Sequence, residues 1–228
     1  MSTAVAEQID PQVEARARQT LGVSDSAIYQ MVAGFIKDRH LKGGVLVDVG
    51  CGEGQLWPHV SAWFSQYVGV DCVRYENFPV AGDFYRSNLD GEQTDLPDNF
   101  GDVVVAVETI EHVENPWAFM RHLVRMVKPG GLVIVTTPNQ LSFLSLLTLT
   151  VKKRFASFQD VHYPAHLTAL LEIDLKRIAY ACGLTDMQLR FTEHGRIVLT
   201  PWHYPRFLSR LFPRLLSDNI LLAGSKTI

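Results

Sequence analysis

The sequence predicts an α/β fold in which a doubly wound, mostly parallel sheet holds a ligand at the carboxyl ends of its strands. Three observations predict this fold. An apolar run at 45–49 leads directly into a glycine turn that begins with Gly50 and Gly52. Strand patterns then alternate with helical patterns as far as residue 139. Asp71 closes the second strand pattern about twenty residues after the glycines, where such folds place a carboxylate on ribose hydroxyls.

The elements of the first half follow from their apolar spacing. Residues 24–41 have helical spacing with an N-cap at Ser24 or Asp25, and they end before two glycines. The elements expected after this helix are a strand at 45–49, a helix at 55–65, a strand at 67–71 and a third strand within 83–90. Glycine tolerates positive φ and has no Cβ, so the turn after the first strand lets backbone N–H groups approach a small polar ligand.

The second half continues the alternation. The β-branched run at 101–108 is typical of a central parallel strand that is buried on both faces. Pro116 suits the first turn of a helix that ends at the Lys-Pro-Gly-Gly of residues 128–131, and a strand is expected over 132–139.

Length and composition limit the organisation and the partners. With 228 residues and 47% hydrophobic content, the chain is expected to form one domain over 23–228, preceded by an N-terminal arm at 1–22. The first twenty residues resemble no secretory signal, and we expect a mobile arm or a loosely docked helix there. The net charge of −3 gives no general attraction to DNA, RNA or membranes, so any such contact must be local. Three widely spaced cysteines predict neither disulfides nor zinc and fit a reducing cytoplasm.

Four sequence blocks carry a family resemblance. They are VDVGCGEG at 47–54, GVD at 69–71, GDVVVAVETIEHVENP at 101–116 and VKPGGLVIVTTPN at 127–139. In this order the blocks resemble the class I S-adenosylmethionine-dependent methyltransferases. The resemblance implies a Rossmann-like sheet of seven strands, the last one antiparallel, with a helix at 172–182 and the final strands at 185–193 and 219–226.

The same resemblance implies the cofactor contacts. Asp48 and the backbone of Gly50 and Gly52 would hold the methionine part of S-adenosylmethionine, and Asp71 would hold the ribose. Asn88 would face the adenine, where the family often has Asp. The complete set implied for the cofactor is Asp48, Gly50, Cys51, Gly52, Asp71, Cys72, Asn88, Leu89, Val107 and Glu108.

A group of acids and histidines predicts the chemistry. Glu108, Glu111 and His112 share one face if their segment is helical, and His162 and His166 return later in the chain. This pattern is similar to the ubiquinone-pathway O-methyltransferases and to enzymes that methylate the terminal ribose of small RNAs. It implies a divalent metal such as Mg²⁺ on Glu108, Glu111, His112 and His166. In the alternative, Glu108 binds the cofactor amine, Glu111 caps a helix and His112 is the general base without a metal.

Two segments outside the cofactor blocks are expected to select the acceptor. The insertion at 139–170 begins with an apolar stretch and a basic cluster at 152–154, which predict either a lid or an interfacial contact with a membrane or a lipid-linked substrate. Residues 196–214 interleave aromatic side chains with arginines, and three prolines predict an irregular cover there.

Three functions compete. The leading one is O-methylation of a small molecule such as a sugar, glycolipid, phenol or secondary metabolite, with His112, Glu111 and His166 as the catalytic residues. Removing the proton of a hydroxyl is the task that favours a histidine here. The second is 2'-O-methylation of an RNA terminal ribose, against which the acidic balance counts. The third is a non-catalytic protein that binds S-adenosylmethionine. The oligomeric state is left open.

Overall fold

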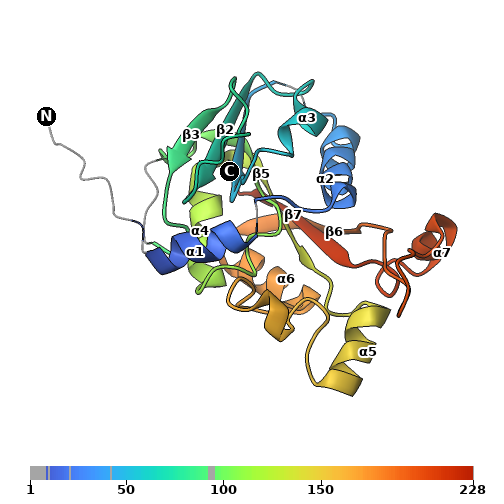
Figure 1. Ribbon diagram of the computed structural model, residues 1–228. Coiled ribbons are helices and arrows are strands. Elements are labelled where there is room, and N and C mark those ends of the chain that lie inside the picture. Colours follow the sequence, from blue (N-terminus) through green and yellow to red (C-terminus); the bar gives the residue numbers. More distant parts are fainter. Residues whose placement is uncertain (1–8, 10, 21, 42, 92–95, 228) are drawn as a thin grey trace, which may run out of the picture.

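A seven-stranded sheet in the order β3-β2-β1-β4-β5-β7-β6 forms the centre of the computed structural model, which describes residues 9, 11–20, 22–41, 43–91 and 96–227 (Figure 1). The strands are β1 (Val45–Val49), β2 (Gln66–Asp71), β3 (Asp83–Arg86), β4 (Gly101–Ala106), β5 (Val127–Pro138), β6 (Leu184–Phe191) and β7 (Asn219–Lys226). The first five strands pair in parallel, and β7 is antiparallel to both β5 and β6. The expected sheet and its antiparallel last strand are confirmed.

Helices cover both faces of the sheet. They are α1 (Pro11–Gln19), α2 (Ser26–Asp38), α3 (Trp57–Val60), α4 (Pro116–Met126), α5 (Phe143–Lys152), α6 (Glu172–Ala181) and α7 (Arg206–Leu211), with a 3₁₀ turn at Asp160–His162. Alternate residues of one strand enter two cores, because successive side chains point to opposite faces. Val47 packs with the core under α4 and α6, and Leu46 packs with the core under α2 and α3. Burial on both faces explains the continuous apolar runs of the central strands.

Several predicted boundaries differ from the structure. The helix expected at 55–65 is a single turn, α3, because the chain then bends so that the carbonyl of Trp63 accepts from the N–H of Gly43 at 2.6 Å. The third strand stops at Arg86. The strand expected at 132 begins at Val127, which pairs with Gly101 of β4 before a register shift. The glycines after α4 therefore lie inside an extended strand.

The N-terminal arm expected at 1–22 contributes a helix, and residues 1–8, 10 and 21 of it lie outside the described residues. Helix α1 is fixed from two sides: Arg16 forms ion pairs with Asp90 and Glu114, and the Tyr75 hydroxyl donates to the Ala17 carbonyl at 3.0 Å. In the part of the chain that the structure describes, no helix is long and apolar enough to cross a membrane.

Candidate active site

A cavity of about 390 Å³ lies at the carboxyl ends of β1, β2 and β4. The glycine loop after β1 forms its floor, and the segment at 107–113 after β4 forms one wall. Residues of α1, of the segment that leads into α2, of 71–75, of 89–90 and of 161–166 also line it. In the described chain, neither α5 nor the 196–214 segment contributes to this lining. Parallel strands thus place the cavity where open α/β sheets bind their ligands.

The glycine loop has a shape that only glycine allows. Gly50 has a φ of +74°, and a Cβ on it would lie 2.3 Å from the Thr109 hydroxyl oxygen. The N–H of Gly52 donates to Asp71 Oδ2 at 2.9 Å, and the N–H of Gly50 donates to the Val70 carbonyl at 2.7 Å. The acid at the end of β2 therefore holds the loop, and the absent Cβ atoms leave its backbone accessible from the cavity.

The structure brings together nearly all residues that were expected to contact the cofactor. The expected residues that line the cavity are Asp48, Gly50, Cys51, Gly52, Asp71, Cys72, Leu89, Val107 and Glu108. Asn88 is the exception among them, because its Oδ1 turns to accept from the N–H of Asp90 at 3.0 Å. Its two successors, Leu89 and Asp90, line the cavity instead.

Buried carboxyl groups dominate the electrostatics of the cavity. Burial raises the pKa of Asp48 to about 7, although the Tyr67 hydroxyl donates to it at 2.7 Å and so favours the ionised form. Burial also raises the pKa of Asp71, of Glu108 and of Glu111. A positively charged ligand would offset this cost by stabilising the carboxylates. The cavity is therefore suited to a cationic group.

Glu108 stands apart from the other acids of its segment. Residues 108–112 form a turn rather than the helix considered above, since Glu108 has a φ of +48° and the Thr109 hydroxyl donates back to the Val107 carbonyl at 3.1 Å. The carboxylate of Glu108 accepts from Thr136 Oγ1 at 2.8 Å and from Asn219 Nδ2 at 2.7 Å. Strands β5 and β7 therefore hold this side chain by hydrogen bonds.

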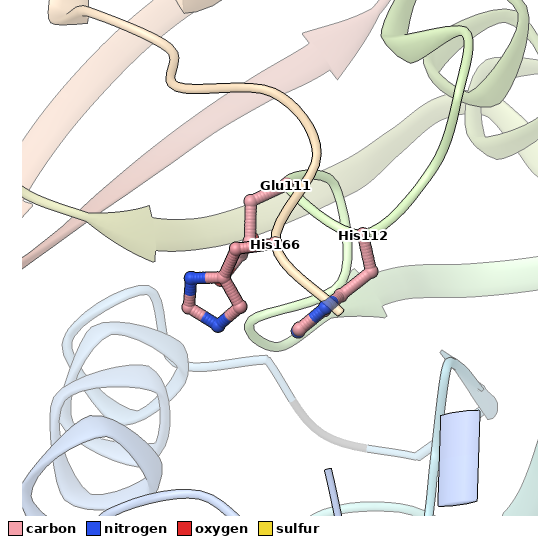
Figure 2. A group of neighbouring side chains, drawn as sticks. All are labelled: Glu111, His112 and His166. Carbon is pink, nitrogen blue, oxygen red and sulfur yellow. The ribbon is translucent and has the colours of Figure 1, made fainter. Parts of the chain in front are cut away.

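The side chains of the other three predicted metal ligands lie close together. One potential ligand atom from each of Glu111, His112 and His166 lies within 4.8 Å of the others. Figure 2 shows these side chains converging from two loops, the turn after β4 and the segment that follows the 3₁₀ turn. The rings of His112 and His166 pack edge to face with centroids 4.7 Å apart. Glu111 Oε1 and His166 Nδ1 are buried without a hydrogen-bond partner among the described residues.

The protonation of the two histidines follows from their surroundings. His112 Nδ1 lies 2.8 Å from the Ala165 carbonyl oxygen, which only accepts, so this nitrogen carries the proton. Burial lowers the pKa of His112, and the neutral ring then has its lone pair on Nε2. Burial and the neighbouring His112 lower the pKa of His166 to about 4. Both imidazoles are neutral near pH 7 and available as a base or as ligands.

Sequence reasoning missed several residues of the lining. They are Arg16, Tyr75, Asp90 and Thr109, and His162 was noticed without being given a role. Asp90 lies two residues after Asn88, the expected adenine position, and this was the one available signal. No sequence signal pointed to Arg16, because α1 reaches the cavity only through the tertiary fold.

The strand order, the glycine loop and the acid at the end of β2 together define the class I methyltransferase fold. A family model described as a methyltransferase domain matches residues 29–189. The chain therefore belongs to the S-adenosylmethionine-dependent methyltransferase family.

Curated relatives are similar over part of their length. A ubiquinone biosynthesis O-methyltransferase of Rickettsia conorii is 31% identical over 163 residues, which are 68% of this chain and 54% of the relative. One of Azorhizobium caulinodans is 33% identical over 135 residues, 50% of this chain and 53% of the relative. The chain spans about half the length of these relatives. A SAM-dependent methyltransferase structure from Archaeoglobus fulgidus has a TM-score of 0.59 at 16% identity and covers 95% of this chain and 100% of its own, so it supports the fold.

Proposed function

We propose that this protein transfers the methyl group of S-adenosylmethionine to a hydroxyl group of a small molecule, with His112 as the general base. The observation that carries the proposal is the hydrogen bond from His112 Nδ1 to the Ala165 carbonyl, which leaves Nε2 unprotonated. The curated relatives are named as O-methyltransferases, and this supports attack by an oxygen.

The cavity fits S-adenosylmethionine in size and charge. About 390 Å³ is within the range of cofactor sites. The buried acids would stabilise the positive sulfonium and ammonium groups of the cofactor. In this proposal Asp48 and the backbone of Gly50 and Gly52 bind the methionine part. Asp71 accepts hydrogen bonds from the ribose hydroxyls with the carboxylate lone pairs that are not used by its hydrogen bonds to the backbone.

The reaction requires alignment and one proton transfer. The acceptor oxygen forms a bond to the methyl carbon while the carbon–sulfur bond breaks, and its electron pair stays on sulfur to give S-adenosylhomocysteine. The hydroxyl proton moves to His112 Nε2. Alignment of oxygen, carbon and sulfur supplies most of the acceleration, because the sulfonium is already activated. A general base adds about 10² to 10⁴ in rate.

The unpartnered atoms of Glu111 and His166 favour a metal-assisted variant of the same reaction. Glu111, His112 and His166 would hold a divalent cation, which would lower the pKa of an acceptor hydroxyl. Glu108 would not belong to this set because it is hydrogen-bonded to Thr136 and Asn219. Two imidazoles and one carboxylate suit Mn²⁺, Fe²⁺ or Zn²⁺ better than Mg²⁺.

The test measures transfer of labelled methyl groups to a panel of phenols, catechols, sugars and a short RNA, with and without EDTA. His112→Asn should lower kcat about 10² or more while cofactor affinity stays within about twofold. His122→Asn on α4, outside the cavity lining, is the matched control. Unchanged turnover in His112→Asn would refute the base. The metal-assisted variant would be selected if EDTA abolished the activity of the wild type and Mn²⁺ restored it, while His166→Asn remained inactive even with Mn²⁺.

A further inference from the structure

Helices α5 and α7 turn most of their large apolar side chains toward solvent. Phe143, Leu147 and Val151 lie at intervals of four residues along α5 and share one exposed face, on which Val151 is 71% exposed. On α7, Phe207 is 65% and Leu211 is 68% exposed. Scattered exposed apolar residues are ordinary, but two aligned faces indicate a surface that binds something.

The inward faces of the same helices are polar. Ser145 is the buried residue of α5, and its hydroxyl accepts from the N–H of Ala156 at 3.2 Å and donates to Gln140 Oε1 at 3.4 Å. Ser209 is the buried residue of α7. Both helices therefore have the reverse of the usual orientation, in which leucine and phenylalanine face the core. The fold buries these two serines, leaves Leu144, Leu149 and Leu208 half-buried, and exposes the other large apolar side chains of the two helices.

The two helices belong to one surface. The N–H of Phe143 at the start of α5 donates to the carbonyl of Leu215, shortly after α7, at 2.7 Å. Asn139 Nδ2 donates to the Arg214 carbonyl at 2.7 Å. Figure 1 shows α5 and α7 projecting from the end of the molecule that is opposite β3. We call this surface, formed by residues 143–154 and 202–215, the apical face.

The apical face is also the positive end of an acidic protein. Segments 139–163 and 196–216 contain seven of the 21 Lys and Arg residues and one of the 24 acids, so the rest of the chain has 14 basic and 23 acidic residues. Arg154, Arg210 and Arg214 are paired with acids. Lys152 and Lys153 instead donate to neutral oxygens of Gln159 and Thr150. Uncompensated positive charge thus borders the apolar side chains.

We propose that the apical face docks on the surface of an anionic lipid bilayer. Aromatic and aliphatic side chains would enter the boundary between headgroups and acyl chains, and the basic residues at the rim would attract the lipid phosphates. A second copy of the chain is the poorer occupant, because symmetric pairing would bring two positive faces together. Docking requires neither cofactor nor acceptor, so it stands independently of the proposed reaction.

Only a few residues of the chain separate this face from the cavity lining. Residues 153–160 lead from the end of α5 to Val161, which is 76% exposed and also lines the cavity. His166 follows a few residues later. The segment that carries two of the cavity's histidines, His162 and His166, is therefore continuous in the chain with the apical face.

Flotation with vesicles tests the proposal, because bound protein rises with lipid while aggregated protein sinks. The wild type should float with mixed phosphatidylcholine–phosphatidylglycerol vesicles, not with phosphatidylcholine alone, and added salt should weaken binding. Phe207→Ser with Leu211→Ser should lower the partition coefficient about tenfold or more. These side chains are exposed, so the variant should keep the wild-type circular dichroism.

Charge variants supply an independent measurement. Lys152→Glu with Arg206→Glu should also lower partitioning about tenfold or more, since each basic residue near an anionic surface contributes about fivefold. The matched controls, Lys37→Glu with Arg121→Glu and the exposed Val80→Ser, should float like the wild type. Absence of flotation, or equal flotation of apical and control variants, would overturn the proposal. So would a dimer that Phe207→Ser with Leu211→Ser splits without any lipid binding.

Discussion

Asp48 should make the ligand-free protein less stable as pH rises, and Asp48→Asn should remove that loss. The pKa of this buried carboxyl is raised from 3.8 to about 7, so folding disfavours its ionised form. The penalty is absent below pH 3.8, grows with pH and is complete above about pH 7. At about 1.36 kcal/mol per pH unit, it amounts to about 1.6 kcal/mol at pH 5 and about 4 kcal/mol at pH 8.

Urea unfolding of wild type and Asp48→Asn between pH 5 and pH 8 measures this penalty directly. The asparagine keeps the shape and accepts from the Tyr67 hydroxyl, so the variant should gain about 3 kcal/mol over the wild type across this range. Contributions of the other buried acids cancel in the difference unless they contact residue 48. Glu76→Gln, an exposed acid, is the control. A difference between Asp48→Asn and wild type that stays constant with pH would show that water solvates Asp48, contrary to this reasoning.

Three further substitutions test the glycine loop, the hydrogen bond to Asp48 and the attachment of α1. Gly50→Ala should destabilise the protein by about 2 kcal/mol or more and abolish S-adenosylmethionine binding by calorimetry, because its Cβ would strike Thr109 at positive φ; near-wild-type affinity would contradict this. Tyr67→Phe should lower the free energy of unfolding at pH 8 by about 1.5–3 kcal/mol through loss of its bond to ionised Asp48, whereas an effect under about 0.5 kcal/mol would argue against that bond. Arg16→Ala should speed amide exchange in 11–19 about tenfold, and unchanged exchange would show that its two ion pairs do not hold α1.

Local patterns in the sequence determined the sheet and the glycine loop after β1. The apolar run at 45–49, the glycines after it and Asp71 each report a short-range requirement of backbone or burial. The positive φ values in the loop explain why glycine was needed there. Helix length was harder to predict: the helix expected at 55–65 shortened to one turn because Trp63 had to meet Gly43.

Tertiary structure decided which of the four predicted metal ligands lie together. Spacing alone put Glu108, Glu111 and His112 on one face if the segment was helical. In the structure Glu108 has a positive φ, the chain turns there, and the Glu108 carboxylate is hydrogen-bonded to Thr136 of β5 and Asn219 of β7. His166 reached the same place from a separate loop. Such meetings depend on long-range packing, which a local pattern does not encode.

The same division holds for α5 and α7. The sequence showed that an apolar stretch in 139–151 leads into a basic cluster at 152–154, but the periodicity of that stretch is the same whether an apolar stripe faces the core or the solvent. Only the fold determined that Ser145 and Ser209 point inward. Orientation toward a core depends on what the rest of the chain has already covered, and that is a property of the assembled molecule.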